Sequence, residues 1–234
     1  HAESDPSFVV QPDKNIFYCF NCQRGGDAAR FLMMQEHCSE EDAWIRLAQR
    51  YGIELGNEAV GDELYRVSLF AQQWFENILH HDEMGSAVGL GYFRGRGLTD
   101  DIINSFGLGY CPEEWTQFTD AAKREGFSEE VLVQSGLTVR RDDGRLYDRF
   151  KGRVTFPIYS VSGRVLGFSC RILRKDEKIA KYVNSPESPI YDKGAILYGL
   201  YQAKEAIKQA DKCYLVEGNV DVVSMHQCGV TTTV

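Results

Sequence analysis

The stretch "RFKGRVTFPIYSVSGRVLGFSCRI" (residues 149–172) decides the fold of this chain, because apolar residues recur with a period of two in two successive runs. In the first run the odd positions carry the cations Arg149, Lys151 and Arg153, and the even positions carry Phe150, Val154, Phe156 and Ile158. After a turn at "SVSGR", the second run has Leu166, Phe168, Cys170 and Ile172 on one parity and Arg171 on the other. Side chains alternate between the faces of a strand, so the pattern predicts two antiparallel strands that bury the even face and project a row of cations from the other.

The charge around this hairpin favours a phosphate-binding surface, although a solvated face remains the simpler alternative. Between Arg140 and Lys181 there are twelve basic and five acidic residues, a local charge of +7 in a chain whose net charge is −8. The remainder of the chain therefore carries −15. This excludes a protein that coats nucleic acid with its whole surface and favours a basic groove on an acidic body.

Length and composition indicate an ordinary globular protein. With 234 residues, 43% of them hydrophobic and 26% charged, one or two soluble domains are expected. No apolar run approaches the roughly 20 residues that span a bilayer, and no signal peptide is visible. The chain starts at His1 without an initiator Met and stops at "TTTV", so we expect a fragment of a longer protein.

The seven cysteines do not form a disulfide framework, and they predict reduced thiols in a cytosolic compartment. Cys19 and Cys22 have the spacing of a zinc knuckle, and structural zinc takes four nitrogen or sulfur ligands. His1 lies eighteen positions before Cys19 and is a candidate third ligand, with the fourth upstream of the chain. Buried thiols, and a His1 left from a tag, are the alternatives.

Several helices follow from capping and periodicity. Residues 1–35 are expected to form short strands around turns, with "NIFYCFNC" (15–22) the strongest. A helix is predicted from the cap Ser39 to Gly52, with apolar residues at Trp44, Leu47, Ala48 and Tyr51. After a linker at 56–62, a long amphipathic helix carries Leu64, Val67, Ala71, Trp74 and Ile78, with Phe70 and Phe75 widening its apolar face. Two short helices with Thr or Ser caps lie within 97–108 and 126–137.

The end of the chain predicts a strand–helix–strand unit. A helix at 197–210 precedes the buried strand "CYLVEG" (213–218), the helix "VDVVSMHQCG" (220–229) and the strand "VTTTV" (230–234). Glu217 and Asp221 lie where such sheets bind ligands, and hard Mg²⁺ takes oxygen ligands. From these residues alone a helix start is the simpler interpretation, because Asp221 is favoured at the positive end of a helix. The loop "KYVNSPESPIYDKG" (181–194) adds Lys181 and Lys193, which are ordinary surface charges on the simplest interpretation.

Taken together, these motifs resemble the bacterial DnaG-type primase family along nearly the whole chain. "H-x-E-x-x-PSF-x-V" with "F-x-CF-x-C-x-x-GGD" is similar to its Cys-His-Cys-Cys zinc ribbon, and the native-like "DPSF" argues against a tag. "GRGLTDDIINSFGLGY" resembles the start of the RNA polymerase domain. "DRFKGRVTFPI", "GRVLGFSCRIL" and "KYVNSPESPIYDKGAILYGLYQAK" resemble its basic subdomain, and "LVEGNVDVV" resembles the Toprim motif E-G-x-x-D-V.

The resemblance implies an α+β fold in four parts. These are a zinc-binding domain of the CHC2 type at 1–55, truncated at its N-terminus, a linker at 56–62, a mixed α/β basic subdomain at 63–210, and the truncated start of a Toprim βαβ fold at 211–234.

It also implies roles for individual residues. Zn²⁺ would be held by His1, Cys19 and Cys22, in a module that helps to select a template trinucleotide. Template or nucleotide would be bound by Arg149, Lys151, Arg153, Arg171, Tyr182 and Asn184. The catalytic residues would be Lys181 and Lys193, near the initiating nucleotide, with Glu217 and Asp221 as the acids that organise Mg²⁺ or Mn²⁺.

The implied reaction is primer synthesis on single-stranded DNA, in which a ribonucleotide 3′-hydroxyl attacks the α-phosphate of a ribonucleoside triphosphate and pyrophosphate leaves. The setting would be the cytoplasmic replication fork, without membrane contact, and a replicative helicase would bind a C-terminal domain outside this chain. Asn219 stands where the family commonly has Tyr, and the remaining Toprim acids would lie beyond Val234. The alternatives are a phage-type primase–helicase, decided by downstream Walker motifs, and a single-stranded-DNA-binding module without catalysis. A Toprim nuclease or topoisomerase accounts less well for the zinc ribbon.

Overall fold

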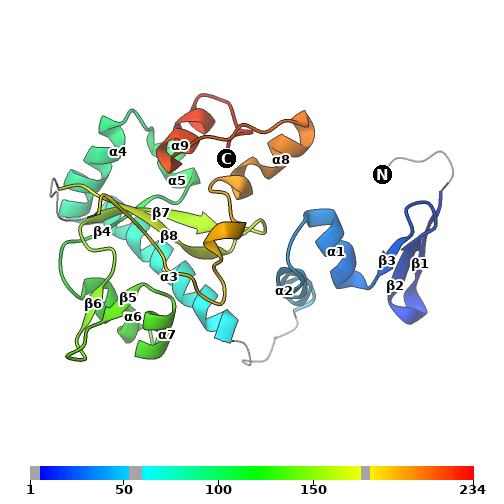
Figure 1. The fold of residues 1–234 in the computed structure, drawn as a ribbon, viewed down its shortest axis with the longest axis horizontal. Helices are drawn as coiled ribbons and strands as arrows, with labels where there is room; N and C mark the ends of the chain where they lie inside the picture. Colours follow the sequence, from blue (N-terminus) through cyan, green and yellow to red (C-terminus); the bar gives the residue numbers. More distant parts are fainter. Residues whose placement is uncertain (1–5, 53–59, 175–179) are drawn as a thin grey trace. The chain divides into compact units, whose positions relative to one another are not determined.

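The computed structural model describes residues 6–52, 60–174 and 180–234. The chain divides into two compact units, His1–Asn57 and Glu58–Val234. Each unit has its own antiparallel sheet and its own helices (Figure 1). This mixture of helices and antiparallel sheets confirms the predicted α+β class.

The first unit is built on a three-stranded antiparallel sheet in the order β1-β2-β3. Its elements are β1 (Phe8–Gln11), the 3-10 turn η1 (Pro12–Lys14), β2 (Ile16–Cys19), β3 (Arg24–Gly26), α1 (Ala28–Glu36) and α2 (Glu40–Tyr51). β2 confirms the strand predicted in "NIFYCFNC". The expectation of strands up to residue 35 is wrong from Ala28 onward. There the Asp27 carboxylate accepts a hydrogen bond from Arg30 N at 2.8 Å and caps the start of α1.

Helix α2 confirms the helix predicted from Ser39 to Gly52. The Ser39 hydroxyl accepts a hydrogen bond from Asp42 N at 3.1 Å, and Gly52 ends the helix with a φ of +64°. Its apolar face is narrower than the sequence indicates, since Trp44 is 46% exposed and Tyr51 70% exposed. One buried cluster of this unit consists of the small residues Ala29, Cys38 and Ala43, and Phe17 is the largest buried side chain outside it.

The second unit is organised by a four-stranded antiparallel sheet in the order β4-β7-β8-β9. Its strands are β4 (Gly109–Cys111), β7 (Arg153–Tyr159), β8 (Val165–Ile172) and β9 (Tyr182–Asn184), with a separate hairpin of β5 (Thr138–Arg140) and β6 (Leu146–Asp148). The helices are α3 (Val60–His81), the π-helical turn η2 (Gly85–Leu90), α4 (Gly91–Gly95), α5 (Asp100–Ser105), α6 (Gln117–Arg124), α7 (Glu129–Gln134), the 3-10 turn η3 (Lys193–Ala195), α8 (Leu200–Ala210) and α9 (Asn219–Gln227). The paired strands β7 and β8 confirm the predicted hairpin.

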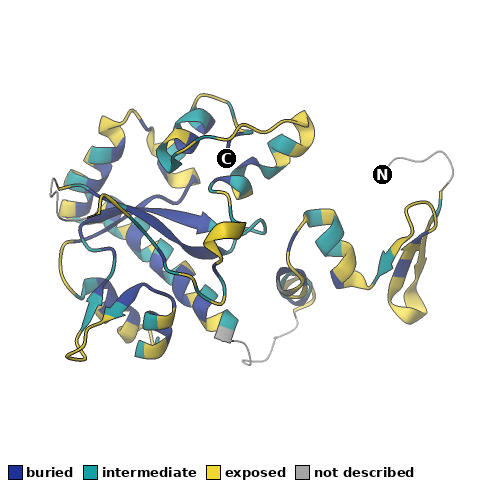
Figure 2. Cartoon of the chain, viewed as in Figure 1, coloured by how far each residue is buried: buried dark blue, intermediate teal, exposed yellow. Residues whose placement is uncertain are grey.

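Helices cover both faces of this sheet. Buried residues of α3 pack with Phe168 and Cys170 on one face, whereas α4, α5 and α9 contribute to the core around Val154 and Phe156 on the other. Figure 2 accordingly shows β7 and β8 as almost continuously buried. The periodicity predicted α3 correctly, but the helix starts at Val60, inside the segment 56–62 expected to be a linker.

The predicted row of cations along one face is wrong. β7 begins only at Arg153, so Arg149 and Lys151 lie in the preceding turn. The register places Val154 opposite Arg171, and Arg153 opposite Ile172. Residues directly opposite one another share a face of the sheet, so Arg153 and Arg171 lie on different faces.

Helix α9 confirms the predicted helix, but the flanking segments 213–218 and 230–234, both expected to be strands, are joined by one isolated bridge and do not form strands. A single parallel bridge joins Tyr214 to Thr233 on either side of α9, with hydrogen bonds of 2.9–3.0 Å around it. The buried strand expected at 213–218 is wrong, because Leu215 is 74% exposed. Within the described part of the chain, this segment pairs only with residues 232–234. No helix in the same described part is long and apolar enough to cross a membrane.

Candidate functional site

A cleft of about 510 Å³ lies where β8, β9 and the start of α9 meet. Its walls are formed by Arg96, Ser169, Arg171, Lys181, Tyr182, Asn184, Glu217, Gly218, Asn219, Val220 and Asp221. Six residues singled out from the sequence therefore lie together: Arg171, Lys181, Tyr182, Asn184, Glu217 and Asp221. With Arg96 included, segments up to 125 residues apart in the sequence form one concave surface.

The sheet register supplies one wall of the cleft. Arg171 lies opposite Tyr182, and Ser169 lies opposite Asn184, in the β8–β9 pair. These side chains consequently share the face of the sheet that α9 partly covers. Residues 182–184, expected to belong to an irregular loop, are in fact an edge strand, and this pairing is what aligns them.

Carboxylates form the opposite wall. Glu217 precedes α9 and Asp221 lies in its first turn, and both side chains are exposed to the cleft. A Cβ at Gly218 would lie only 2.9 Å from Asp221 Oδ2, so a side chain at this position would displace the carboxylate from where it lies. The oxygen ligands suit a hard divalent cation, which also retains water and substrate oxygens.

A tyrosine orders the cationic wall. Arg171 donates a hydrogen bond from Nη1 to the Tyr92 hydroxyl, and its Cζ lies 4.9 Å from the centre of the Tyr92 ring. Arg96 approaches the same ring at 5.6 Å. Burial raises the pKa of Tyr92, against the opposing effect of the two guanidiniums, so the phenol stays neutral and accepts the Arg171 hydrogen bond.

The same cleft contains polar atoms with unused hydrogen-bonding capacity. Arg171 Nε and Asn184 Oδ1 are buried and have no hydrogen-bond partner among the described residues. Buried polar groups are normally paired, so these two residues of the cleft wall each retain unused hydrogen-bonding capacity.

Four other predicted residues lie elsewhere. Arg149 donates from Nε to the carbonyl of Gly136, and Arg153 donates to the carbonyls of Lys151 at 3.1 Å and Ala180 at 3.4 Å. Burial lowers the pKa of both guanidiniums. Both side chains hydrogen-bond to backbone carbonyls and so connect neighbouring segments of the chain. Lys193 is exposed in η3 and does not line the cleft.

Lys151 belongs to a second basic surface, the Trp115 cluster, formed by Trp115, Arg141, Tyr147 and Lys151. Lys151 Nζ lies 3.7 Å from the Trp115 ring centre and Arg141 Cζ 4.8 Å from it, while the Trp115 and Tyr147 rings meet edge to face at 5.9 Å. Trp115 remains 52% exposed.

The sequence interpretation missed Trp115 and Arg96. The basic run from residue 140 was visible, but Trp115 is brought to it only by folding, through a hydrogen bond of 2.7 Å from Asp148 N to Trp115 O. Arg96 lies in a glycine-rich turn that carries no local indication of function.

The cysteine pair lies at the turn between β2 and β3. The backbone N–H of Cys22 and the Ser7 hydroxyl lower the pKa of the Cys19 thiol, with a smaller contribution from Asn21 N–H. The Ser7 hydroxyl lies 3.4 Å from Cys19 Sγ. N–H groups that donate to a thiolate stabilise the form of cysteine that binds zinc, so the surroundings of Cys19 fit a zinc knuckle. His1 lies outside the described residues.

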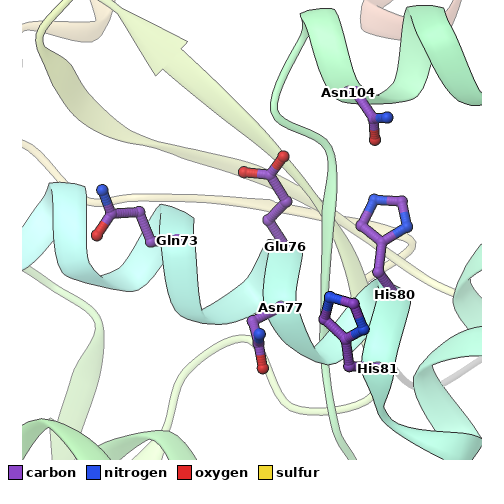
Figure 3. A pocket seen from close by; sticks show the side chains of 6 residues that line it. All are labelled: Gln73, Glu76, Asn77, His80, His81 and Asn104. Carbon is purple, nitrogen blue, oxygen red and sulfur yellow. The ribbon is translucent and has the colours of Figure 1, made fainter.

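A second polar cleft, of about 660 Å³, lies between α3 and α5 (Figure 3). It is lined by Gln73, Glu76, Asn77, His80, His81 and Asn104. None of these residues was predicted to be functional, and no group of three or more potential metal ligands occurs in the ranges that the structure describes.

Comparison with known proteins gives two family matches. Residues 74–204 match the model described as "DNA primase catalytic core, N-terminal domain", and residues 1–63 match "CHC2 zinc finger". The curated DNA primase of Deinococcus radiodurans is 41% identical over 238 residues, which cover all of this chain and 40% of that protein. The chain thus spans about two fifths of the length of the first curated relatives.

Solved structures agree with these matches. The crystal structure of the Aquifex aeolicus primase, with its zinc-binding and RNA polymerase domains, is 32% identical with a TM-score of 0.69 and covers all of this chain and 57% of that one. The structure of a DnaG primase catalytic domain bound to ssDNA is 36% identical with a TM-score of 0.66 and covers 74% of this chain and 55% of that one.

Proposed function

Because this chain belongs to the DnaG-type DNA primase family, we propose that its protein synthesises short RNA primers on single-stranded DNA during replication. Such a nucleotidyltransferase joins a ribonucleotide 3′-hydroxyl to an incoming triphosphate with release of pyrophosphate. The chain would contribute the zinc module, the cationic wall of the active site and the first two Toprim acids. The cytoplasmic replication fork and a helicase partner stay predictions.

The cleft between β9 and α9 is the observation that carries this proposal. Arg96, Arg171 and Lys181 supply positive charge on one side, and Glu217 and Asp221 supply carboxylates on the other. A nucleoside triphosphate with its divalent cation needs both kinds of wall, since the cations bind phosphate oxygens and the carboxylates bind the metal.

Within this cleft each side chain has a proposed task. Lys181 binds phosphate as a compact point charge, while Tyr182, 48% exposed, offers a ring for stacking against a base or ribose. Glu217 and Asp221 hold Mg²⁺ or Mn²⁺, which when bound stabilises negative charge on the attacking and leaving oxygens. Lys193 would have to approach substrate from outside the cleft.

We further propose that Cys19 and Cys22 hold the structural zinc of the CHC2 module, together with His1. The match to the CHC2 zinc finger and the lowered pKa of the Cys19 thiol support this ligand set. A zinc ion at this turn would stabilise a unit whose buried apolar core is small.

The Trp115 cluster supports a path for template DNA outside the cleft. Arg141 and Lys151 would bind backbone phosphates beside a half-exposed indole, the combination that single-strand-binding surfaces use. One similar catalytic domain was solved bound to ssDNA. The same observation favours the second candidate function, in which this chain binds single-stranded DNA without catalysis.

The test uses the full-length protein, with Mg²⁺, ribonucleotides and a single-stranded template. Glu217→Gln should reduce primer synthesis at least ~100-fold, as expected for loss of a metal-organising carboxylate, while template binding persists. Glu205→Gln, at an exposed position of α8, is the matched control and should be active. Primer synthesis by the Glu217→Gln variant at the wild-type rate would contradict the catalytic assignment. Template binding by wild type without any synthesis would favour the binding-module alternative.

A further inference from the structure

The last residue of α9, Gln227, connects that helix to the loop between α4 and α5. Gln227 Oε1 accepts hydrogen bonds from Thr99 N at 2.8 Å and from Thr99 Oγ1 at 3.2 Å. Gln227 Nε2 donates to the carbonyl of Gly97 at 2.8 Å. One side chain thus makes three hydrogen bonds to residues about 130 positions earlier in the chain.

The two segments joined in this way carry opposite walls of the cleft. Arg96, on the cationic wall, directly precedes Gly97, whose φ of +79° turns the chain toward Thr99. Asp221, on the carboxylate wall, lies in the first turn of the helix that Gln227 ends. Movement of this loop relative to α9 would therefore change the separation between a cation and a carboxylate of the site.

Glutamine suits this position for a chemical reason. The contact needs an acceptor for Thr99 and a donor for Gly97, and a side-chain amide provides both. Thr99 is itself the N-cap of α5, where its hydroxyl accepts from Ile102 N at 3.5 Å. The Gln227 contact therefore also restrains the first turn of α5.

We infer that Gln227 is a positioning residue, which holds Arg96 at a fixed distance from the acids of the cleft. The catalytic part of this inference rests on the proposed function. The structural part, a side-chain tie between α9 and the loop at 97–99, does not.

The first experiment measures the tie itself by amide hydrogen exchange at Thr99 in the full-length protein. Gln227→Met removes all three hydrogen bonds at similar volume and should speed exchange of the Thr99 amide about tenfold, as loss of a hydrogen bond predicts. Gln227→Glu keeps the acceptor and should have a smaller effect. Gln134→Met, at an exposed position of α7, is the control and should leave Thr99 unchanged. Unchanged exchange in Gln227→Met would overturn the inference.

The second experiment asks whether the tie acts through Arg96. Gln227→Met should lower primer synthesis by about tenfold, because small displacements of catalytic groups are costly, and Gln227→Glu should restore part of it. The factor by which Arg96→Ala lowers primer synthesis should be at least ~3-fold smaller in the Gln227→Met variant than in wild type, since the effects of substitutions at coupled residues are not additive. Additive losses would overturn the positioning role. If the wild-type protein makes no primers, the proposed function is wrong. The exchange measurement at Thr99 then still tests the hydrogen bonds of Gln227, because it does not depend on activity.

Discussion

Replacement of Trp115 by alanine should weaken binding of single-stranded DNA without unfolding the second unit. The indole is 52% exposed, and its contacts to Lys151 and Arg141 lie at the surface. Its removal therefore deletes a stacking surface rather than part of the core.

The magnitude follows from the exposed part of the ring. Stacking of one base on an aromatic side chain contributes ~1–3 kcal/mol. Because Lys151 and Arg141 already cover part of the indole, one base at most can stack, and the lower part of that range applies. A loss of ~1–2 kcal/mol corresponds to dissociation constants raised about 5- to 30-fold.

Fluorescence anisotropy with a labelled oligonucleotide at fixed salt measures this change in the full-length protein. Leu69→Ala, at a 48% exposed apolar position of α3, is the matched control and should bind like wild type. Trp115→Phe should lie between wild type and Trp115→Ala, since a smaller ring remains. Equal affinities of wild type and Trp115→Ala, with unchanged thermal unfolding, would refute the template path over this cluster.

Three further predictions concern charge, stability and metal. Lys151→Met should lower the slope of log affinity against log salt by ~0.7, because one phosphate contact with single-stranded DNA is lost, whereas an unchanged slope would place Lys151 outside the interface. Asp148→Ala should lower the free energy of unfolding, measured in urea, by ~3–5 kcal/mol. The reason is that the Asp148 carboxylate accepts hydrogen bonds from Phe118 N, Thr119 N and Thr119 Oγ1 at 2.6–2.9 Å. A loss below ~1 kcal/mol would show that water replaces these hydrogen bonds. Cys19→Ser should abolish the stoichiometric zinc measured by atomic absorption and lower the thermal stability of the first unit only, because the lowered pKa of Cys19 favours the metal-binding thiolate; full zinc content in this variant would exclude Cys19 as a ligand.

The sequence by itself determined the features that depend on neighbouring residues. The helix starts at Ser39, Thr99 and Ser128 were predicted correctly, because each side chain caps a backbone N–H only three residues away. The period of α3 and the β7–β8 hairpin are local in the same sense. The family resemblance, carried by long motifs in order, pointed to most residues of the cleft.

Only the tertiary structure decided which of the basic residues act together. The period of two predicted one cationic face, yet the register of β7 and β8 places Arg153 and Arg171 on different faces of the sheet. The register depends on where the preceding turn ends and on the helices that bury both faces of the sheet. The alternation of apolar and polar residues within one strand predicts neither. The same long-range packing brings Arg96 to the acids before and in α9, and Trp115 to the basic run that contains Lys151.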